Sequence, residues 1–129
     1  MDAAAALADL TEICSQVEAA VVVDTAGTVL AATDDGERLA RVGTDLLEAA
    51  QEDFGGRRSV TKLEVALREA SVFVLREAGL VLVARTCAGP ASGLVLYDLG
   101  SCLQSIDPPA AAKKRRSRAK RKEQATADA

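Results

Sequence analysis

The residues of this chain that could do nucleophilic or metal chemistry are three cysteines, Cys14, Cys87 and Cys102. A catalytic thiol usually needs a histidine as its base, and the chain contains no histidine. Three cysteines far apart in the sequence also lack the ligand number and spacing of a zinc site. Each cysteine lies in an apolar pattern, so we expect all three to be small buried side chains. We expect no cofactor.

Other charged pairs have equally simple interpretations. Asp34–Asp35 and Glu52–Asp53 lie at the ends of a predicted helix, where capping or solvation accounts for them. Gly55–Gly56 is followed by Arg57–Arg58 and a predicted strand, whereas a Walker loop ends in Lys-Ser/Thr and precedes a helix. The two arginines could contact an anion or lie in a solvated loop. An enzyme is therefore the least favoured class.

The net charge of −3 conceals two oppositely charged parts. Residues 1–112 contain 8 basic and 17 acidic side chains, a net charge of −9, and residues 113–129 contain 8 basic and 2 acidic side chains, a net charge of +6. The cations of this basic segment are Lys113, Lys114, Arg115, Arg116, Arg118, Lys120, Arg121 and Lys122. They could bind nucleic acid, an anionic membrane surface, or an acidic protein surface including that of this chain. They could also be merely solvated.

Length and composition predict one folded domain. The chain has 129 residues, 49% of them apolar, which is enough for a single core. We expect residues 1–107 to form the domain and residues 108–129 to be a low-complexity, disordered tail. No apolar run approaches the roughly 18–20 residues that span a bilayer, and the first residues lack the basic region of a signal peptide. We therefore expect a cytoplasmic protein.

Turns and apolar runs predict the element order αββαβββα. The predicted elements are a helix at 3–17, strands at 19–23 and 28–33, a helix at 37–54, strands at 59–67, 71–76 and 80–86, and a helix from Pro90 to Ile106. The strands at 71–76 and 80–86 are apolar on both faces, which favours a sheet covered by helices on both sides. Alternating charges predict that strand 59–67 lies at an edge. We expect Gly93 and Gly100 to allow close approach of the first helix.

The middle helix carries two groups of residues of interest. Its core stripe is predicted at Leu39, Val42, Leu46, Ala50 and Phe54, spaced by three or four. Beside this stripe lie Ala40, Gly43 and Thr44, leading to Leu47. These small residues would let another helix approach closely, so they could form an interface. They could equally reflect the general abundance of alanine in this chain.

The chain resembles the Roadblock/dynein light chain family in three features. These are the element order, the apolar run that leads into Asp-x-x-Gly at Ala20–Gly27, and the later turns. The nearest kind is its single-domain bacterial branch, which includes MglB. The resemblance spans about residues 3–106 and depends on element order, not on a catalytic motif. It implies an α+β fold of the Roadblock/profilin-like type, with a five-stranded antiparallel sheet sandwiched between helices.

The resemblance also implies a function. Family members commonly form homodimers through their middle helices and third strands, and they bind Ras-like small GTPases or act as scaffold subunits. MglB-like dimers stimulate hydrolysis by arranging the GTPase's own residues. We therefore expect a non-enzymatic homodimeric regulator or recruiter of a small GTPase. The alternatives are a scaffold without regulatory effect, or an adaptor tethered to nucleic acid or membrane by its tail. The candidate interface residues are Ala40, Gly43, Thr44, Leu47, Glu48, Gln51, Lys62 and Glu64.

Overall fold

The computed structural model describes residues 1–33, 36–55 and 60–107. The elements in this part of the chain are α1 (Ala3–Ile13), β1 (Val17–Asp24), β2 (Val29–Ala32), α2 (Gly36–Asp53), β3 (Lys62–Ala66), β4 (Ala70–Glu77), β5 (Leu80–Cys87) and α3 (Ser92–Ser105). The predicted order αββαβββα is confirmed. Among these helices, none has the length and apolar character needed to span a membrane.

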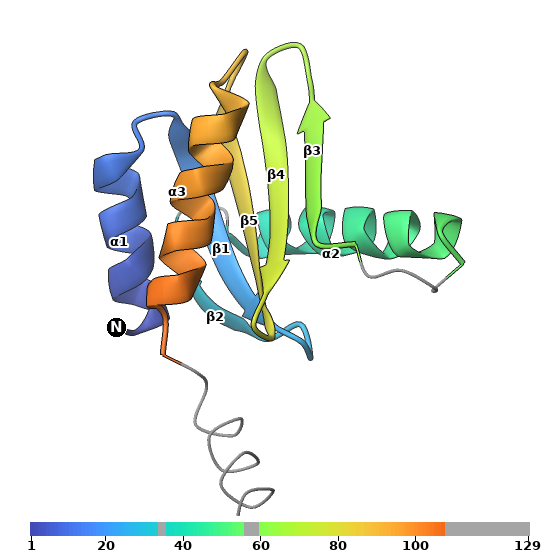
Figure 1. The fold of residues 1–129 in the computed structure, drawn as a ribbon, viewed down its shortest axis with the longest axis horizontal. Coiled ribbons are helices and arrows are strands. Elements are labelled where there is room, and N and C mark those ends of the chain that lie inside the picture. The colour runs from blue at the N-terminus through green and yellow to red at the C-terminus, as the bar shows by residue number, and fades with distance from the viewer. Residues whose placement is uncertain (34–35, 56–59, 108–129) are drawn as a thin grey trace, which may run out of the picture.

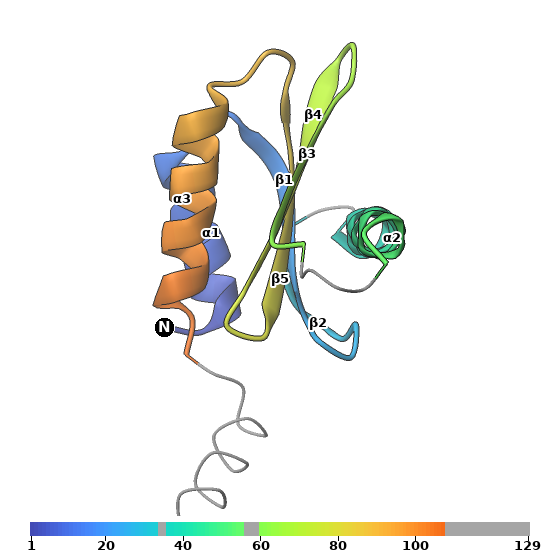
Figure 2. The same cartoon turned by 45° about the vertical axis from the view of Figure 1, so that its right-hand side comes forward.

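The strands form one antiparallel sheet in the order β2-β1-β5-β4-β3. Helices α1 and α3 cover one face of this sheet, and α2 covers the other (Figures 1 and 2). Strands β1, β4 and β5 are buried along most of their length because both of their faces are covered. The predicted helix–sheet–helix arrangement is confirmed, as is the edge position of β3.

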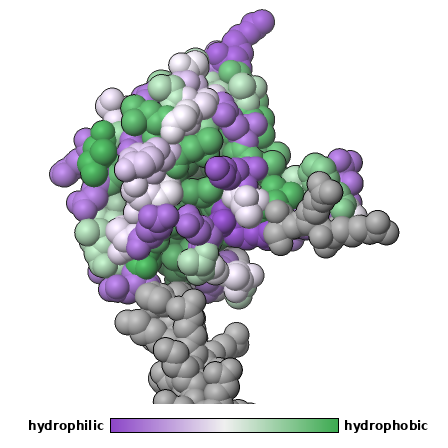
Figure 3. All heavy atoms as spheres, in the orientation of Figure 1, coloured by the Kyte–Doolittle hydropathy of each residue, from purple (hydrophilic) through white to green (hydrophobic). Residues whose placement is uncertain are grey.

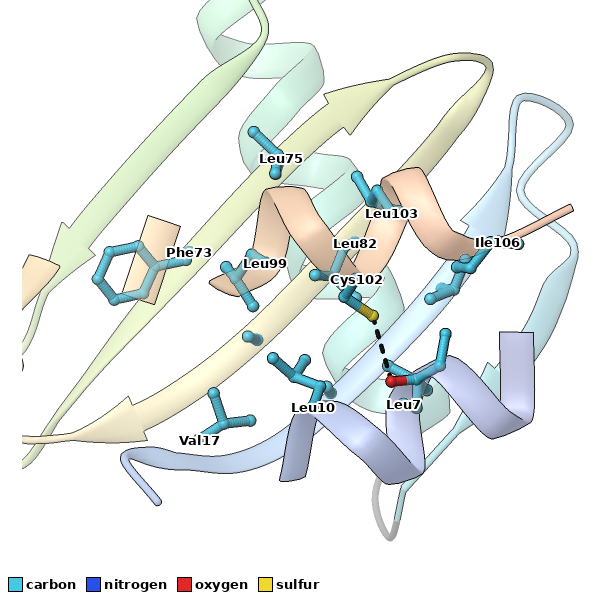
Figure 4. Close-up of a cluster of buried hydrophobic side chains, with 14 of the residues drawn as sticks. Leu7, Leu10, Val17, Phe73, Leu75, Leu82, Leu99, Cys102, Leu103 and Ile106 are labelled. Atoms are coloured by element: carbon cyan, nitrogen blue, oxygen red, sulfur yellow. Dashed lines mark hydrogen bonds between the residues drawn. The ribbon is translucent and has the colours of Figure 1, made fainter. Parts of the chain in front are cut away.

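The core is divided by the sheet into two clusters, because side chains alternate between its faces. On the first face, Leu7 and Leu10 of α1 meet Leu99 and Leu103 of α3 over Leu82 of β5 (Figure 4). On the second face, the buried side chains come from α2 and from β1, β4 and β5: Ala19, Val21, Val23, Leu39, Ala40, Leu47, Val72, Val74, Val81 and Val83.

The predicted turn between β1 and β2 is confirmed, and its residues explain its shape. The Asp24 Oδ1 atom accepts hydrogen bonds from the backbone N–H groups of Ala26 and Thr28, each at 2.9 Å. Gly27 has φ 85°, a conformation that side-chain-bearing residues rarely adopt. The turn therefore depends on one acceptor side chain and one glycine.

Several predicted boundaries are wrong. Helix α1 ends at Ile13 instead of residue 17, because Cys14 is extended and Val17 already belongs to β1. Helix α3 begins at Ser92, so Pro90 lies outside its first turn. Strand β3 is shorter than predicted, and Ser59 lies outside the described residues.

The predicted role of the α3 glycines is also wrong. A Cβ on Gly93 would meet nothing within 4 Å, and one on Gly100 would lie 3.9 Å from Leu75 of β4. Helix α3 contacts α1 through another side, where the Cys102 thiol donates to the Ala6 carbonyl at 3.5 Å (Figure 4). The predictions for Asp34, Asp35, Arg57, Arg58 and residues 108–129 lie outside the described residues.

Candidate interface on helix α2 and strand β3

Helix α2 runs across the strands, and its C-terminal turns project beyond β3 (Figure 1). In the middle of the helix, it approaches the sheet closely at Gly43. A Cβ on this residue would lie 2.7 Å from Cγ1 of Val83 and nearer still to Cγ2. The absence of a side chain at Gly43 therefore lets the helix rest on β5, and this contact determines which side of α2 faces the sheet.

The side of α2 that faces the sheet contains most of the small-residue group predicted as an interface. Ala40 and Leu47 are 7% and 8% exposed, and both belong to the core of their own chain, as does Gly43. The prediction that Ala40 and Leu47 belong to an exposed binding face is wrong, because both are buried in their own chain. The physical reason is that the small residues accommodate β5 instead of another helix.

The polar members of the predicted set lie on one flank of α2. Thr44 is half-buried, and its hydroxyl donates to the Ala40 carbonyl at 2.8 Å. Gln51 accepts a hydrogen bond from the backbone N–H of Val60 at 3.0 Å, and Glu48 is exposed. This polar flank borders an open depression of about 230 Å³ beside the β1–β2 turn, to which Asp24 and Arg76 also contribute.

The opposite flank of α2 is apolar and partly exposed. Val42 is 42% exposed, Leu46 is half-buried and Ala49 is exposed, and these residues follow one another on one side of the helix. Phe54, just after the helix, is 56% exposed. The prediction that Val42 and Phe54 point into the core is wrong. The apolar arc of α2 is wider than its contact with the sheet, so part of it reaches the surface.

Strand β3 continues this apolar flank. Leu63 and Val65 are half-buried and pair with Val74 and Val72, whose side chains lie on the α2 face of the sheet. Among the described strands, β3 pairs only with β4, so its other backbone edge is open. We call Val42, Leu46, Ala49, Leu63 and Val65 the α2–β3 strip. The family resemblance implies a dimer surface on helix 37–54 and strand 59–67, which contain this strip, but its side chains were not among the candidate interface residues named from the sequence.

Lys62 and Glu64, the predicted charged residues of β3, are both exposed. They pair with Leu75 and Phe73, so they lie on the face covered by α3 and not on the α2 face. Glu64 accepts a hydrogen bond from the Ser92 hydroxyl of α3 at 2.7 Å. The structure thus divides the predicted interface residues among the core, the polar flank of α2 and the opposite face of β3.

Potential metal ligands are not grouped together in the described part of the chain. No group of three or more His, Cys, Asp or Glu side chains in this part of the chain could hold a metal ion. Burial raises the pKa of the Cys102 thiol to about 11 and also raises that of Cys14, so both thiols stay protonated at neutral pH. These two cysteines are buried as expected, whereas Cys87 is only half-buried.

No protein-family model matches the chain, and no curated protein matches its sequence. A solved structure, the Roadblock/LC7 domain from Streptomyces avermitilis, matches it with a TM-score of 0.70 over 81% of this chain and 94% of that one, at 18% identity. The chain has the Roadblock/LC7 fold. The resemblance seen in the sequence is thereby confirmed as a likeness of fold.

Two further structures with the Roadblock/LC7 fold are MglB proteins. MglB from Thermus thermophilus matches with a TM-score of 0.60 over 75% of this chain and 82% of that one, at 18% identity. MglB from Myxococcus xanthus matches with a TM-score of 0.58 over 78% of this chain and 84% of that one, at 15% identity. The Roadblock/LC7 fold of this chain is therefore MglB-like.

Proposed function

We propose that this protein is a non-enzymatic, homodimeric regulator or recruiting partner of a Ras-like small GTPase. The observation that carries the proposal is an MglB-like fold whose α2–β3 strip and open sheet edge have no partner among the described residues. The family resemblance supplies the kind of partner.

The α2–β3 strip is the surface for a second copy of the chain. An open strand edge beside apolar side chains is a template for pairing with another strand. Two copies related by a twofold axis present the same strip to each other, so one sequence supplies both sides of the contact. Pairing the β3 edges would satisfy their free backbone groups, while Val42 and Leu46 would be removed from water.

The polar flank of α2 is the surface for the GTPase. Thr44, Glu48 and Gln51 lie on the opposite side of the helix from Val42, so dimerisation through the strip leaves them accessible. Asp24 and Arg76 add one acidic and one basic group to the same depression. A depression that combines an apolar floor with both charges at its margin fits the mixed surface of a protein partner.

The test is affinity capture from a lysate of the source organism, with either GDP or a non-hydrolysable GTP analogue present. We expect capture of a small GTPase in a nucleotide-dependent manner. Glu48→Arg should abolish this capture, whereas Glu12→Arg on α1, an exposed site with the same charge change, should not. Negligible capture under both conditions would refute the proposal. Capture without any change in hydrolysis or exchange rate would favour the scaffold alternative.

A further inference from the structure

The face of the sheet opposite α2 carries a groove between α1 and α3, which lie side by side (Figures 1 and 2). The groove encloses about 150 Å³, and its walls include Leu10, Ile13 and Cys102. Ile13 is 72% exposed. Hydrophobic and hydrophilic residues are interspersed on this face of the molecule (Figure 3). The groove is therefore an apolar channel with a polar margin.

The charged side chains around this groove are all acidic, and the N-terminal ammonium group of Met1 lies at one end of it, paired with Asp107 at 3.3 Å. Residues 1–16 and 88–107, which contain α1 and α3, have five carboxylate side chains and no lysine or arginine. Two of these carboxylates, Asp9 and Asp98, line the groove itself. The ion pairs found among the described residues involve neither of them. Among the described residues, the cation of this groove is thus the Met1 ammonium group at one end, and it is paired with Asp107 and not with Asp9 or Asp98.

Both carboxylates are directed between the helices. Burial raises the pKa of the Cys102 thiol on α3, and the Asp9 carboxylate of α1 raises it further. Burial likewise raises the pKa of Cys14, next to α1, and Asp98 of α3 adds to the rise. The Asp9 carboxylate therefore lies near Cys102 on α3, and the Asp98 carboxylate lies near Cys14 at the end of α1. Both carboxylates are thus close to the space between the two helices.

The chain leaves the described domain at one end of this groove. The backbone N–H of Asp107 donates to the Met1 carbonyl at 2.8 Å, and Met1 and Ser105 line that end. From Asp107, six residues lead to Lys113, a span of up to about 20 Å. Asp98 lies seven residues before Ser105, the last residue of α3, a distance of about 10 Å along the helix. The basic segment is thus long enough to return to the acidic margin.

We propose that the α1–α3 groove is the docking site of the basic segment 113–122 of the same chain. The large side chains of this segment are all lysine or arginine. Their alkyl stems can lie along the apolar channel while their charged ends reach Asp9 and Asp98. The tether keeps the segment at high effective concentration, which favours docking even through exposed ion pairs. Docking withholds these cations from external polyanions until salt or a competing polyanion releases them.

Trypsin cleavage of the full-length chain tests this proposal, because free lysine and arginine residues are cut faster than docked ones. The groove variant is Asp9→Asn with Asp98→Asn. The matched control is Asp45→Asn with Glu52→Gln, which removes the same charge from exposed sites on α2. At low salt, we expect cleavage within 113–122 to be about fivefold faster in the groove variant than in the wild type or the control, since two exposed ion pairs are lost. At 0.5 M NaCl, the three rates should converge.

A second measurement does not depend on protease access. Replacing the eight cations of the segment by glutamine in the full-length chain should shift the backbone amide resonances of Asp9, Ile13, Asp98 and Ser101, with little change on α2. Equal cleavage in the groove variant and the control, with amide shifts absent from the groove, would overturn the proposal. Protection seen only after adding duplex DNA or phosphatidylserine vesicles would also overturn it and assign the cations to a polyanion. Protection lost on dilution would place the segment on a second copy.

Discussion

A lysine at Val42 should separate the proposed dimer without unfolding the protomer. Val42 is 42% exposed on α2 and belongs to the α2–β3 strip. Its substitution by lysine changes a surface site, and such changes usually alter the stability of a protein by less than about 0.5 kcal/mol. Val29→Lys is the matched control, because Val29 is 38% exposed on β2, at the other edge of the sheet.

The size of the effect follows from exposure and symmetry. Fully burying a valine contributes about 1.5–3 kcal/mol, so covering the exposed 42% of Val42 contributes roughly 1 kcal/mol per protomer. The dimer loses this contribution twice. Each new ammonium group that is buried without a partner costs about 1–3 kcal/mol more. The total of about 4–8 kcal/mol corresponds to a rise in Kd of roughly a thousandfold or more.

Sedimentation velocity over a dilution series measures the association directly. We expect the wild type and Val29→Lys to sediment as dimers at concentrations where Val42→Lys is a monomer. Circular dichroism should give the three proteins similar spectra and melting temperatures. A Val42→Lys protein that stays dimeric would refute the assignment of the interface to this side of α2. A monomeric wild type at high micromolar concentration would refute the homodimer itself.

Three further predictions concern the fold. Gly43→Ala should lower the free energy of unfolding by about 1–3 kcal/mol in urea titrations, because its Cβ would overlap Val83, whereas Gly93→Ala should raise it by up to about 1 kcal/mol, since its Cβ meets nothing within 4 Å. The free energy of unfolding should fall as pH rises from about 9 towards 11. The reason is that Cys102 in the native protein, with a pKa of about 11, keeps its proton at pH values where the unfolded thiol has lost it. The variant Cys102→Ala should therefore show a weaker dependence of stability on pH. Asp24→Ala should cost about 1–2 kcal/mol in the same titrations by removing the acceptor for Ala26 and Thr28, and Asp24→Asn should cost less.

The sequence was sufficient for the arrangement of elements because hydrophobic periodicity and turn chemistry are local. Strands β4 and β5 are apolar on both faces, which requires cover on both sides. The turn at Asp24 and Gly27 is specified by its own residues. The end of α1 was mispredicted because Cys14 and Val17 continue a helical apolar spacing, while pairing with Thr86 on β5 places Val17 in a strand. Because Thr86 is far from Val17 in the sequence, a local pattern of apolar residues does not reveal this pairing.

The rotation of α2 about its axis could not be read from the sequence for the same reason. Periodicity shows that the helix has an apolar arc, but the side of the arc that meets the sheet depends on the contact of Gly43 with Val83, forty residues away. This contact places Ala40 in the core and leaves Val42 at the surface. An arginine at Ala40 would therefore disrupt the protomer, and a loss of association in that variant would say nothing about the interface. Val42→Lys separates the two effects, because it changes the surface that a second copy would cover while leaving the contact with β5 intact.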